Sequence, residues 1–465
     1  MISVVNMIPR ALSDETAQDS EPSIAVNPED PRQMVGSAFT PDPFGGPRAP
    51  IYVSSDGGRT WILHSTVPGG PRTADISVAF ATEGGALYVG TLNGQTKNLN
   101  VLRTADALSP ATMTTLLDRP REDQPWAVAL TVTDGGAARD RVYMSHNDTG
   151  SQPKTASVVL SQDARTGAPP AGFETHVIEE RETMAQDGPP VRAAPHPDGT
   201  VYAAYQRWAR EVASTANVTD VEADIVVARD DDAAAGAHPF RALVDPDDGE
   251  VGIRVATDRF MRFTASVGPL AQERIGADLA LAVDPNDSAS VWIAWCDRVG
   301  GRNGTDWTIH VRHSSDRGAS WSEDLHTVKN AKNPALAVND QGVLGFLRQR
   351  VAGVGSAARW VTELELTADR FGTSVGRFDL HTAPVFALQP KRLPYIGDYI
   401  RLLAIGDELY GAFSGLNEPN RANFPSGVTY QRNADFDAGA LLGVDGASPV
   451  NLSIDPFFVH HVPDA

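Results

Sequence analysis

Acidic or amide side chains stand at the start of seven apolar runs in this chain. These residues are Glu21, Asp75, Asp123, Asp187, Asp278, Asn333 and Asp398. If the runs are equivalent strands around one axis, the side chains meet at one mouth of a central channel. Carboxylates so close together repel unless protons, arginines or a cation neutralise them. Ca²⁺ accepts about six to eight oxygen ligands in loose geometry, so it is the cation that we expect there.

The predicted metal ligands are the six acidic members of this set. They are Glu21, Asp75, Asp123, Asp187, Asp278 and Asp398. An alternative role needs no metal, because the same side chains could bond the backbone N–H groups of neighbouring strands and stitch the strands together. The two roles are compatible for different members of the set.

The elements that must position these residues form a repeated two-strand pattern. A first run rich in Ala, Ser and Val is followed by a turn and by a second run rich in Tyr, Trp and Val, as in residues 75–80 and 87–90. Seven copies at intervals of about 50 to 90 residues predict an all-β, seven-bladed β-propeller of four-stranded antiparallel blades, with six blades as the alternative. The strand-like residues 2–5 and 454–459 are expected to pair and close the ring.

The pattern predicts a single domain that spans residues 1–465. Residues 206–240 interrupt it, and their Ala- and Asp-rich composition predicts a loop insertion. The single cysteine, Cys296, follows Trp295 in an apolar run and is expected in the core.

A second repeated motif has the spacing of a tight hairpin. Residues 54–61 read Ser-Ser-Asp-Gly-Gly-Arg-Thr-Trp and residues 314–321 read Ser-Ser-Asp-Arg-Gly-Ala-Ser-Trp, so both follow S-x-D-x-G-x-(T/S)-W. In such a turn the Asp bonds backbone N–H groups, the Gly takes a positive φ and the Trp packs back as a buried anchor.

Through these two turns and the repeated strands, most of the chain resembles the sialidase-like superfamily of Asp-box (BNR-repeat) propellers. Catalytic members of that superfamily bind a substrate carboxylate with three arginines and use a Tyr nucleophile assisted by a Glu, with an Asp as acid/base. The superfamily's Arg-Ile-Pro signature is not present, since Ile8-Pro9-Arg10 has the same residue types in another order. The resemblance therefore implies the fold more directly than sialidase chemistry.

The catalytic candidates are the acidic, basic and phenolic residues at the predicted strand openings. They are Arg121, Asp123, Asp187, Arg192, Tyr399 and Arg401. Arginine suits a carboxylate because its planar guanidinium donates two parallel hydrogen bonds. Arg207 is a further arginine that could face the channel, and Tyr395, Glu122 and Glu418 could supply or assist a phenol. Several aromatic residues could stack on sugar rings or simply pack in the core: Trp126, Trp208, Trp307, Trp360 and Tyr399.

Composition excludes some classes of partner. The net charge of −20 disfavours nucleic acid and anionic membranes over the whole surface. No apolar run is long enough for a membrane span, and no secretory signal is visible in the chain, which leaves the compartment undecided. A glycan or a protein is the expected partner of a monomer, with no cofactor other than the calcium.

Three functions follow from these observations. The first is binding of a glycan or other ligand over the channel mouth without sialidase chemistry. The second is glycoside hydrolysis or a related reaction on a polysaccharide. The third is a calcium-dependent hydrolase in which the channel carboxylates hold the ion.

Overall fold

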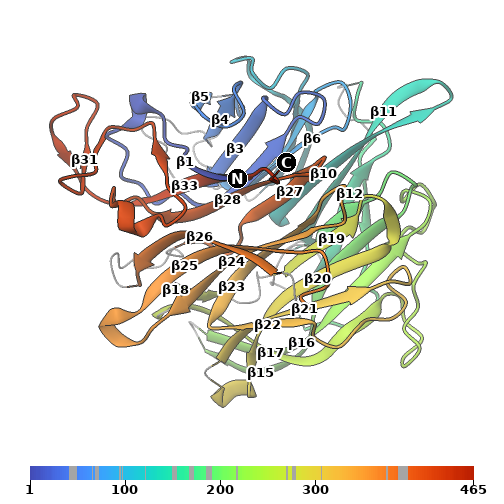
Figure 1. The fold of residues 1–465 in the computed structure, drawn as a ribbon. Coiled ribbons are helices and arrows are strands. Elements are labelled where there is room, and N and C mark those ends of the chain that lie inside the picture. Colours follow the sequence, from blue (N-terminus) through green and yellow to red (C-terminus); the bar gives the residue numbers. More distant parts are fainter. Residues whose placement is uncertain are drawn as a thin grey trace.

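The structure is a computed structural model. It describes residues 1–40, 50–64, 66–68, 73–93, 96, 98–120, 122–148, 154–166, 172–184, 191–215, 218–268, 271–274, 279–304, 306–372, 375–385 and 396–464. The described part of the chain is all-β, with short 3₁₀ turns and no α-helix (Figure 1). None of its helices is long and apolar enough to cross a membrane.

Three sheets are built from consecutive strands of the N-terminal third. Sheet 1 contains β2 (Ser20–Val26), β3 (Met34–Phe39), β4 (Ile51–Ser54) and β5 (Ile62–His64). Sheet 2 contains β6 (Thr73–Phe80), β7 (Leu87–Asn93), β8 (Asn98–Thr104) and β9 (Thr114–Pro120). Sheet 3 contains β10 (Glu122–Asp134), β11 (Ala137–Asp148), β12 (Thr155–Ser161) and β13 (Glu174–Val177).

The next three sheets repeat this plan. Sheet 4 contains β14 (Arg192–Pro195), β15 (Val201–Thr215), β16 (Val218–Asp230), β17 (Ile253–Gly268) and β18 (Ala271–Arg274). Sheet 5 contains β19 (Leu279–Asp284), β20 (Asp287–Val299), β21 (Asp306–Ser314) and β22 (His326–Lys329). Sheet 6 contains β23 (Ala331–Val338), β24 (Leu344–Ala352), β25 (Arg359–Thr367) and β26 (Val375–Pro384).

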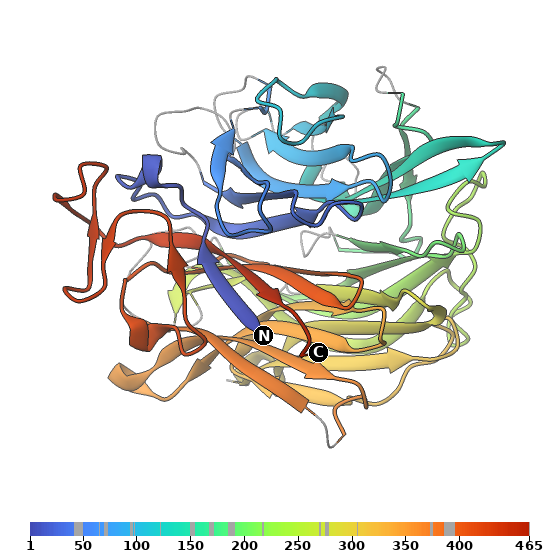
Figure 2. The ribbon, with the colours of Figure 1, turned by 45° about the horizontal axis from the view of Figure 1, so that its top comes forward.

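Sheet 7 combines the two ends of the chain. Its order is β27 (Arg401–Ile405), β28 (Glu408–Leu416), β33 (Ile454–His461), β1 (Ile2–Asn6) and β29 (Thr429–Tyr430). The expected pairing of the terminal strands is present, with β1 antiparallel to β33 and both termini close together (Figure 2). A small sheet of β30 (Ala434–Asp435), β31 (Ala440–Leu442) and β32 (Pro449–Val450) lies between β29 and β33 in the sequence.

The first strands of the seven sheets contact one another in sequence order. Contacts join β2 to β6, β6 to β10, β10 to β14, β14 to β19, β19 to β23, β23 to β27, and β27 back to β2. The predicted first runs of sheets 1, 2, 3, 5 and 6 belong to these strands as far as they are described, whereas Val191 precedes β14 and Asp398–Ile400 precede β27. Their Ala and Ser content lets the strands approach one another closely, where bulkier side chains would collide.

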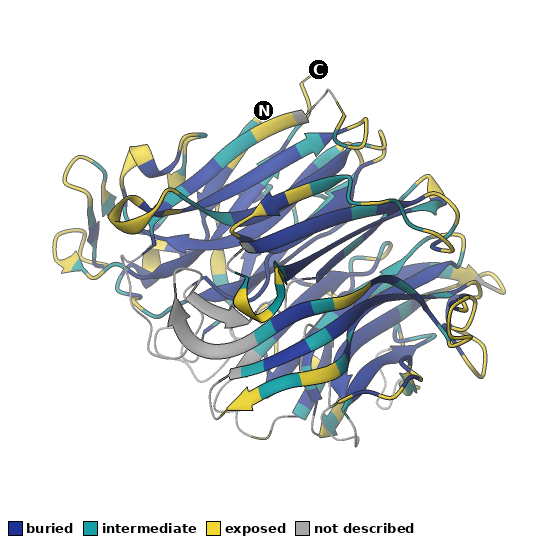
Figure 3. Cartoon of the chain, turned by 90° about the horizontal axis from the view of Figure 1, so that it is seen from below, coloured by how far each residue is buried: buried dark blue, intermediate teal, exposed yellow. Residues whose placement is uncertain are grey.

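The hydrophobic core lies between neighbouring sheets. Tyr143 and Val158 of sheet 3 pack with Val201 of sheet 4, while Ile225 of sheet 4 packs with Trp295 of sheet 5. Both faces of each sheet are therefore covered, which explains why many strands read as continuous apolar runs. Figure 3 shows this pattern as strands that are largely buried and connecting loops that are largely exposed. Cys296 is buried as predicted.

The segment expected to be a loop insertion differs from that expectation. Most of residues 206–240 belong to β15 and β16, which pair antiparallel far beyond the length of β14 and form a long ribbon with β17. Its Ala and Asp residues are interspersed with Val, Ile and Trp, and cross-strand pairing outweighs their weak strand propensity.

Both copies of the repeated turn have the predicted hydrogen bonds. Asp56 Oδ1 accepts from the Thr60 N–H at 2.9 Å, and Asp316 Oδ1 accepts from the Ser320 N–H at 2.9 Å. Each Trp indole then donates to the glycine carbonyl three residues before it, at 3.0 Å for Trp61 and 3.2 Å for Trp321. The turn therefore closes the third strand of its sheet onto the fourth.

The same turn position has a weaker signature in other sheets. In the first copy of the motif, Ser54 Oγ accepts from the N–H four residues later at 3.0 Å. Thr367 Oγ1 and Asp230 Oδ1 also accept from the N–H four residues later, at 2.9 Å and 2.7 Å. Each of these residues ends the third strand of its sheet. The turns after Thr367 and Asp230 lack the glycine and tryptophan at the motif's positions, so the motif did not reveal them.

The two anchor tryptophans differ in burial. Trp61 is 1% exposed and packs edge-on against Phe458 of sheet 7, whereas Trp321 is only half-buried. The expectation that both are buried is therefore wrong for Trp321.

We predict that Trp61→Ala lowers the free energy of unfolding by about 3–5 kcal/mol, because it empties a buried aromatic site. Trp321→Ala should cost less, about 1–2 kcal/mol, because solvent already reaches that ring. Urea denaturation of both variants checks this order, and equal losses would contradict it.

Candidate functional site

The strand openings that we aligned by their acidic residues are bulged. At each bulge two residues of the first strand face one residue of the second strand: Glu21-Pro22 in β2, Ala74-Asp75 in β6, Gln124-Pro125 in β10 and Asn333-Pro334 in β23. Glu21, Gln124 and Asn333 have φ of 54°, 52° and 55°. The structural equivalent of Glu21 is therefore Gln124, not Asp123, and Asp75 occupies the position of Pro22. A bulge adds a residue that periodicity alone does not register.

Side chains at two of the predicted strand starts form hydrogen bonds that connect neighbouring sheets. Glu21 Oε1 accepts from the Asp398 N–H at 3.2 Å, which joins sheet 1 to the start of sheet 7. Asn333 Nδ2 donates to Gln349 Oε1 at 2.8 Å and to the Gly397 carbonyl at 3.2 Å. Gly397 has a φ of 86°, and a Cβ there would lie 2.6 Å from the Glu21 backbone nitrogen. This close approach requires glycine.

The other described acidic candidates contact different groups and do not share a partner. Asp75 Oδ1 accepts from the Tyr399 hydroxyl at 3.3 Å, and Asp123 Oδ1 accepts from the Gln124 N–H at 2.9 Å. Asp187, Asp278 and Arg121 lie outside the described residues, as does Tyr395. Among the described residues, no three His, Cys, Asp or Glu side chains form a group that could hold a metal ion.

The calcium ion stays a prediction because two of its six expected ligands are not described. Metal analysis of protein purified without a chelator checks it. One stoichiometric divalent ion, lost on chelation together with part of the thermal stability, is the expected result. The absence of any stoichiometric ion would contradict the prediction.

Two of the predicted arginines enclose one indole ring. The guanidinium carbon of Arg192, at the start of β14, lies 3.8 Å from the centroid of the Trp126 ring, and that of Arg401, at the start of β27, lies 3.9 Å from it. Both distances are so short that the guanidinium groups must occupy opposite faces of the ring. Tyr399 meets Trp126 edge-on at 6.1 Å, so three of the predicted site residues converge on this tryptophan.

Trp126, Arg192 and Arg401 line a cavity of about 160 Å³ among the first strands, whereas Tyr399 contacts Trp126 without lining that cavity. Arg192 Nε donates to the Leu279 carbonyl at 2.9 Å, and Arg401 donates to the Ala127 carbonyl at 3.3 Å. The Arg401 Nη1 atom is buried and has no hydrogen-bond partner among the described residues. The rest of the lining is apolar, with Leu281, Leu336 and Leu402 from three different strands.

Burial shifts the pKa values of Arg401 and Tyr399. Burial lowers the pKa of Arg401 to about 10, with Tyr399 acting in the opposite direction, so Arg401 is a desolvated cation at neutral pH. Burial, followed by the charge of Asp75, raises the pKa of Tyr399 well above its ordinary value. Tyr399 is thus a protonated phenol, whereas a tyrosine that acts as a nucleophile must lose this proton.

The expected sugar-stacking platforms are mostly core residues. Trp208, Trp307 and Trp360 are buried between sheets, and Tyr399 is 5% exposed. Trp126 is partly exposed, but its two faces are covered by Arg192 and Arg401. Stacking of a sugar on these rings would require the side chains to rearrange.

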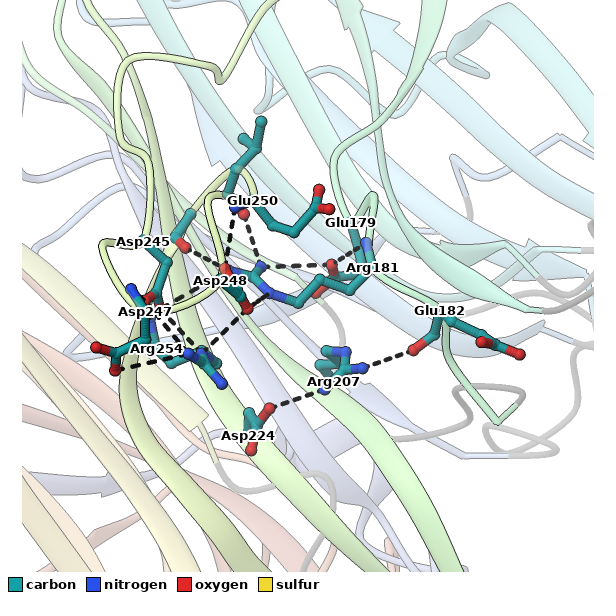
Figure 4. Close-up of polar contacts among 12 residues, drawn as sticks. Glu179, Arg181, Glu182, Arg207, Asp224, Asp245, Asp247, Asp248, Glu250 and Arg254 are labelled. Atoms are coloured by element: carbon teal, nitrogen blue, oxygen red, sulfur yellow. Dashed lines mark hydrogen bonds and ion pairs between the residues drawn. The ribbon is translucent and has the colours of Figure 1, made fainter.

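A separate polar network fastens sheet 4 to its loops (Figure 4). Arg181 pairs with Asp248 at 2.9 Å and donates to the Val251 carbonyl at 2.7 Å. Arg207, which we expected near the channel, instead pairs with Asp224 at 2.9 Å and donates to the Glu182 carbonyl at 2.8 Å. The network also places Glu179 beside the Tyr205 hydroxyl, but both side chains are buried. We assign this network to stability.

The other phenol-assisting candidates are also engaged elsewhere. Glu122 Oε2 lies 2.5 Å from His146 Nδ1 and ion-pairs with Arg119. Glu418 Oε2 accepts from Asn423 Nδ2 at 2.8 Å. The sequence did not indicate that Trp126 is the centre of the site, since its ring is one of several that the aromatic pattern left equivalent.

We predict that Asn333→Ala lowers the free energy of unfolding by about 1–3 kcal/mol, because it leaves the buried Gln349 amide and Gly397 carbonyl without their partner. Thermal and urea denaturation check this value. The exposed Asn451→Ala serves as the matched control and should change little. Equal small effects for both variants would show that Asn333 does not stitch the sheets.

Comparisons with known proteins give structural similarity only. No protein-family model and no curated protein matches the chain. It is similar to the α-L-arabinofuranosidase Arb93A of Fusarium graminearum, with 10% identity, a TM-score of 0.43 and coverage of 98% of this chain and 97% of that one. It is also similar to Drosophila semaphorin 2a, with 9% identity, a TM-score of 0.45 and coverage of 88% and 75%.

A third similar structure is the Hadza microbial sialidase Hz136. The identity is 12%, the TM-score is 0.41 and the coverage is 87% of this chain and 65% of that one. At TM-scores below 0.5, these similarities establish neither a shared reaction nor a shared ligand.

Proposed function

We propose that this chain is a seven-bladed β-propeller, closed by its terminal strands, that binds an acidic sugar residue in the axial cavity without sialidase chemistry. Support for seven blades comes from the cyclic order of contacts among β2, β6, β10, β14, β19, β23 and β27. Support for closure comes from the pairing of β1 with β33.

The observation that carries the proposed ligand is the buried cation of Arg401. A guanidinium removed from water is costly unless it is paired, and the Trp126 ring and one carbonyl satisfy only part of it. A ligand carboxylate would supply the missing acceptor and the counter-charge. No Arg401 ion pair occurs among the described residues to compete with it.

The size of the cavity limits the ligand. An apolar cavity of about 150 Å³ accepts one benzene-sized ring, and the axial cavity is similar at about 160 Å³. A uronic acid is larger than benzene, so we expect the carboxylate-bearing edge of one acidic sugar residue to enter, with the rest of the sugar and any longer chain remaining outside. The apolar floor of Leu281, Leu336 and Leu402 suits the less polar face of such a ring.

Binding is favoured over hydrolysis by the state of the phenol. A sialidase-type reaction would use a tyrosine nucleophile, and the raised pKa of Tyr399 keeps its proton in place. Its hydrogen bond to Asp75 therefore serves to orient the ring beside Trp126.

The test compares galacturonate, glucuronate and N-acetylneuraminate with the neutral sugars galactose and glucose by isothermal titration calorimetry. Wild-type protein should bind at least one acidic sugar and bind its neutral counterpart more weakly. Arg401→Gln should weaken that binding by about 10- to 150-fold, the effect of losing a hydrogen bond to a charged group of about 1.5–3 kcal/mol.

Two controls separate the site from general charge effects. Arg401→Lys keeps the charge without the fork and should give an intermediate affinity. Arg59→Gln removes an exposed arginine from a surface turn and should leave affinity unchanged. Equal binding of acidic and neutral sugars, or equal affinity of wild type and a folded Arg401→Gln, would contradict the proposal.

A further inference from the structure

A second cavity lies away from the axial one, between the long ribbon of sheet 4 and the end of β20. Its volume is about 290 Å³. Its charged lining consists of Glu222, Asp258, Arg259, Asp297, Arg298 and Arg302. The ribbon supplies the first three and the end of β20 with the following turn supplies the others, so the cavity exists only because β15, β16 and β17 extend beyond β14.

Two of the carboxylates in the cavity wall already have cations beside them. Asp297 Oδ1 lies 3.2 Å from His310 Nε2, and its Oδ2 accepts from the Trp295 indole at 3.1 Å. Glu222 accepts from Arg210 Nε at 2.9 Å. Neither acidic side chain therefore has to be neutralised by an arginine of the cavity.

His310 keeps Asp297 compensated at neutral pH. Burial acts to lower the pKa of His310, but its hydrogen bonds to Asp297 and Asp324 outweigh burial and raise the pKa to about 9. The groups that face this imidazole are Asp297, Asp324 and the stacked ring of Trp295, and Arg312 pairs with Asp324 at 2.8 Å.

Two arginines of the cavity keep donors for a ligand. The Arg259 Nε atom forms only a long ion pair of 4.0 Å with Asp297 Oδ2, and this buried atom has no hydrogen-bond partner among the described residues. Arg302 Nε lies 3.4 Å from Asp220 Oδ2, but Arg262 already grips both oxygens of that carboxylate at 2.6 and 2.9 Å. Of the three carboxylates in the lining, Asp258 is the one that has no other cation beside it among the described residues.

We infer that this cavity is a binding site for an oxyanion group, a carboxylate, sulfate or phosphate carried by a small ligand. The lining itself holds three carboxylates and three arginines, and the excess of positive charge arises because Arg210 and His310 already compensate Glu222 and Asp297. Such an excess is unusual in a chain of net charge −20, and it concentrates anions where the surrounding surface repels them. Arg259 is in β17 of sheet 4 and Arg302 is in the turn that follows β20 of sheet 5, so the two guanidinium groups reach the cavity from different elements. Phe260 and Val299 add apolar surface for the body of the ligand.

The experiment titrates acetate, sulfate and inorganic phosphate into the protein and follows binding by calorimetry and by NMR of arginine side chains. At least one anion should saturate a site that Arg259→Gln/Arg302→Gln weakens by about tenfold or more. Arg32→Gln is the matched control, because Arg32 is an exposed arginine paired with a carboxylate elsewhere. Arg401→Gln should leave this site unchanged, which separates it from the axial cavity.

Substitution of Asp258 tests whether the site binds a negatively charged ligand. Asp258→Asn should tighten anion binding, because it removes the one carboxylate that faces the ligand without a cation beside it among the described residues. Weaker binding in Asp258→Asn would mean that the site takes a cation or a zwitterion and would overturn the inference. Binding that does not saturate, or that the double variant leaves unchanged in a folded protein, would also overturn it.

The pH dependence provides an independent readout. As pH rises through about 9, His310 loses its proton and Asp297 becomes an uncompensated negative charge near Arg259, so anion affinity should fall. His310→Gln should remove that step while the protein stays folded, as monitored by circular dichroism. An affinity that rises through this range in the wild type would contradict the assignment.

Discussion

Two guanidinium groups on opposite faces of one indole ring are the interaction on which the axial site depends. Taking a charged side chain out of water costs several kcal/mol, and a desolvated cation–π contact returns about 2 kcal/mol. Arg192, Trp126 and Arg401 come from three sheets, so the stack forms only when β10, β14 and β27 are brought around a common centre. The fold thus buries the Arg401 guanidinium, and the contact with Trp126 offsets only part of its lost hydration.

The approach of these strands depends on small side chains and on bonds that cross between sheets. Ser23 Oγ accepts from the Val78 N–H at 3.2 Å, and Ser77 Oγ accepts from the Ala127 N–H at 2.9 Å, so β2 is tied to β6 and β6 to β10. At the seam between the chain ends, the buried Asp455 is bound by Arg432 at 2.8 Å and by Asn6 at 2.7 Å. Polar groups buried in this way hold one arrangement because any other would leave them without partners.

The sequence allowed the first strands, the hairpin turns and the pairing of the chain ends to be predicted, because all three depend on local period and turn chemistry. The bulges at Glu21, Gln124 and Asn333 were not predictable from period alone, and they moved the alignment of Asp75 and Asp123. The ribbon of β15 and β16 was mistaken for a loop because its Ala and Asp residues have weak strand propensity, which the antiparallel pairing of β15 with β16 and of β16 with β17 outweighs. Arg192, Tyr399 and Arg401 were identified from their positions, whereas their convergence on Trp126 is a tertiary property.

The central claim is that Arg401 in the axial cavity receives the carboxylate of an acidic sugar. A crystal structure of the protein soaked with galacturonate, with a parallel soak in galactose, tests it most directly. The account predicts a carboxylate within hydrogen-bond distance of Arg401 Nη1 and no ligand from galactose at the same concentration. Galacturonate bound with its carboxylate directed away from Arg401, or absent from a cavity that galactose fills, would contradict the account.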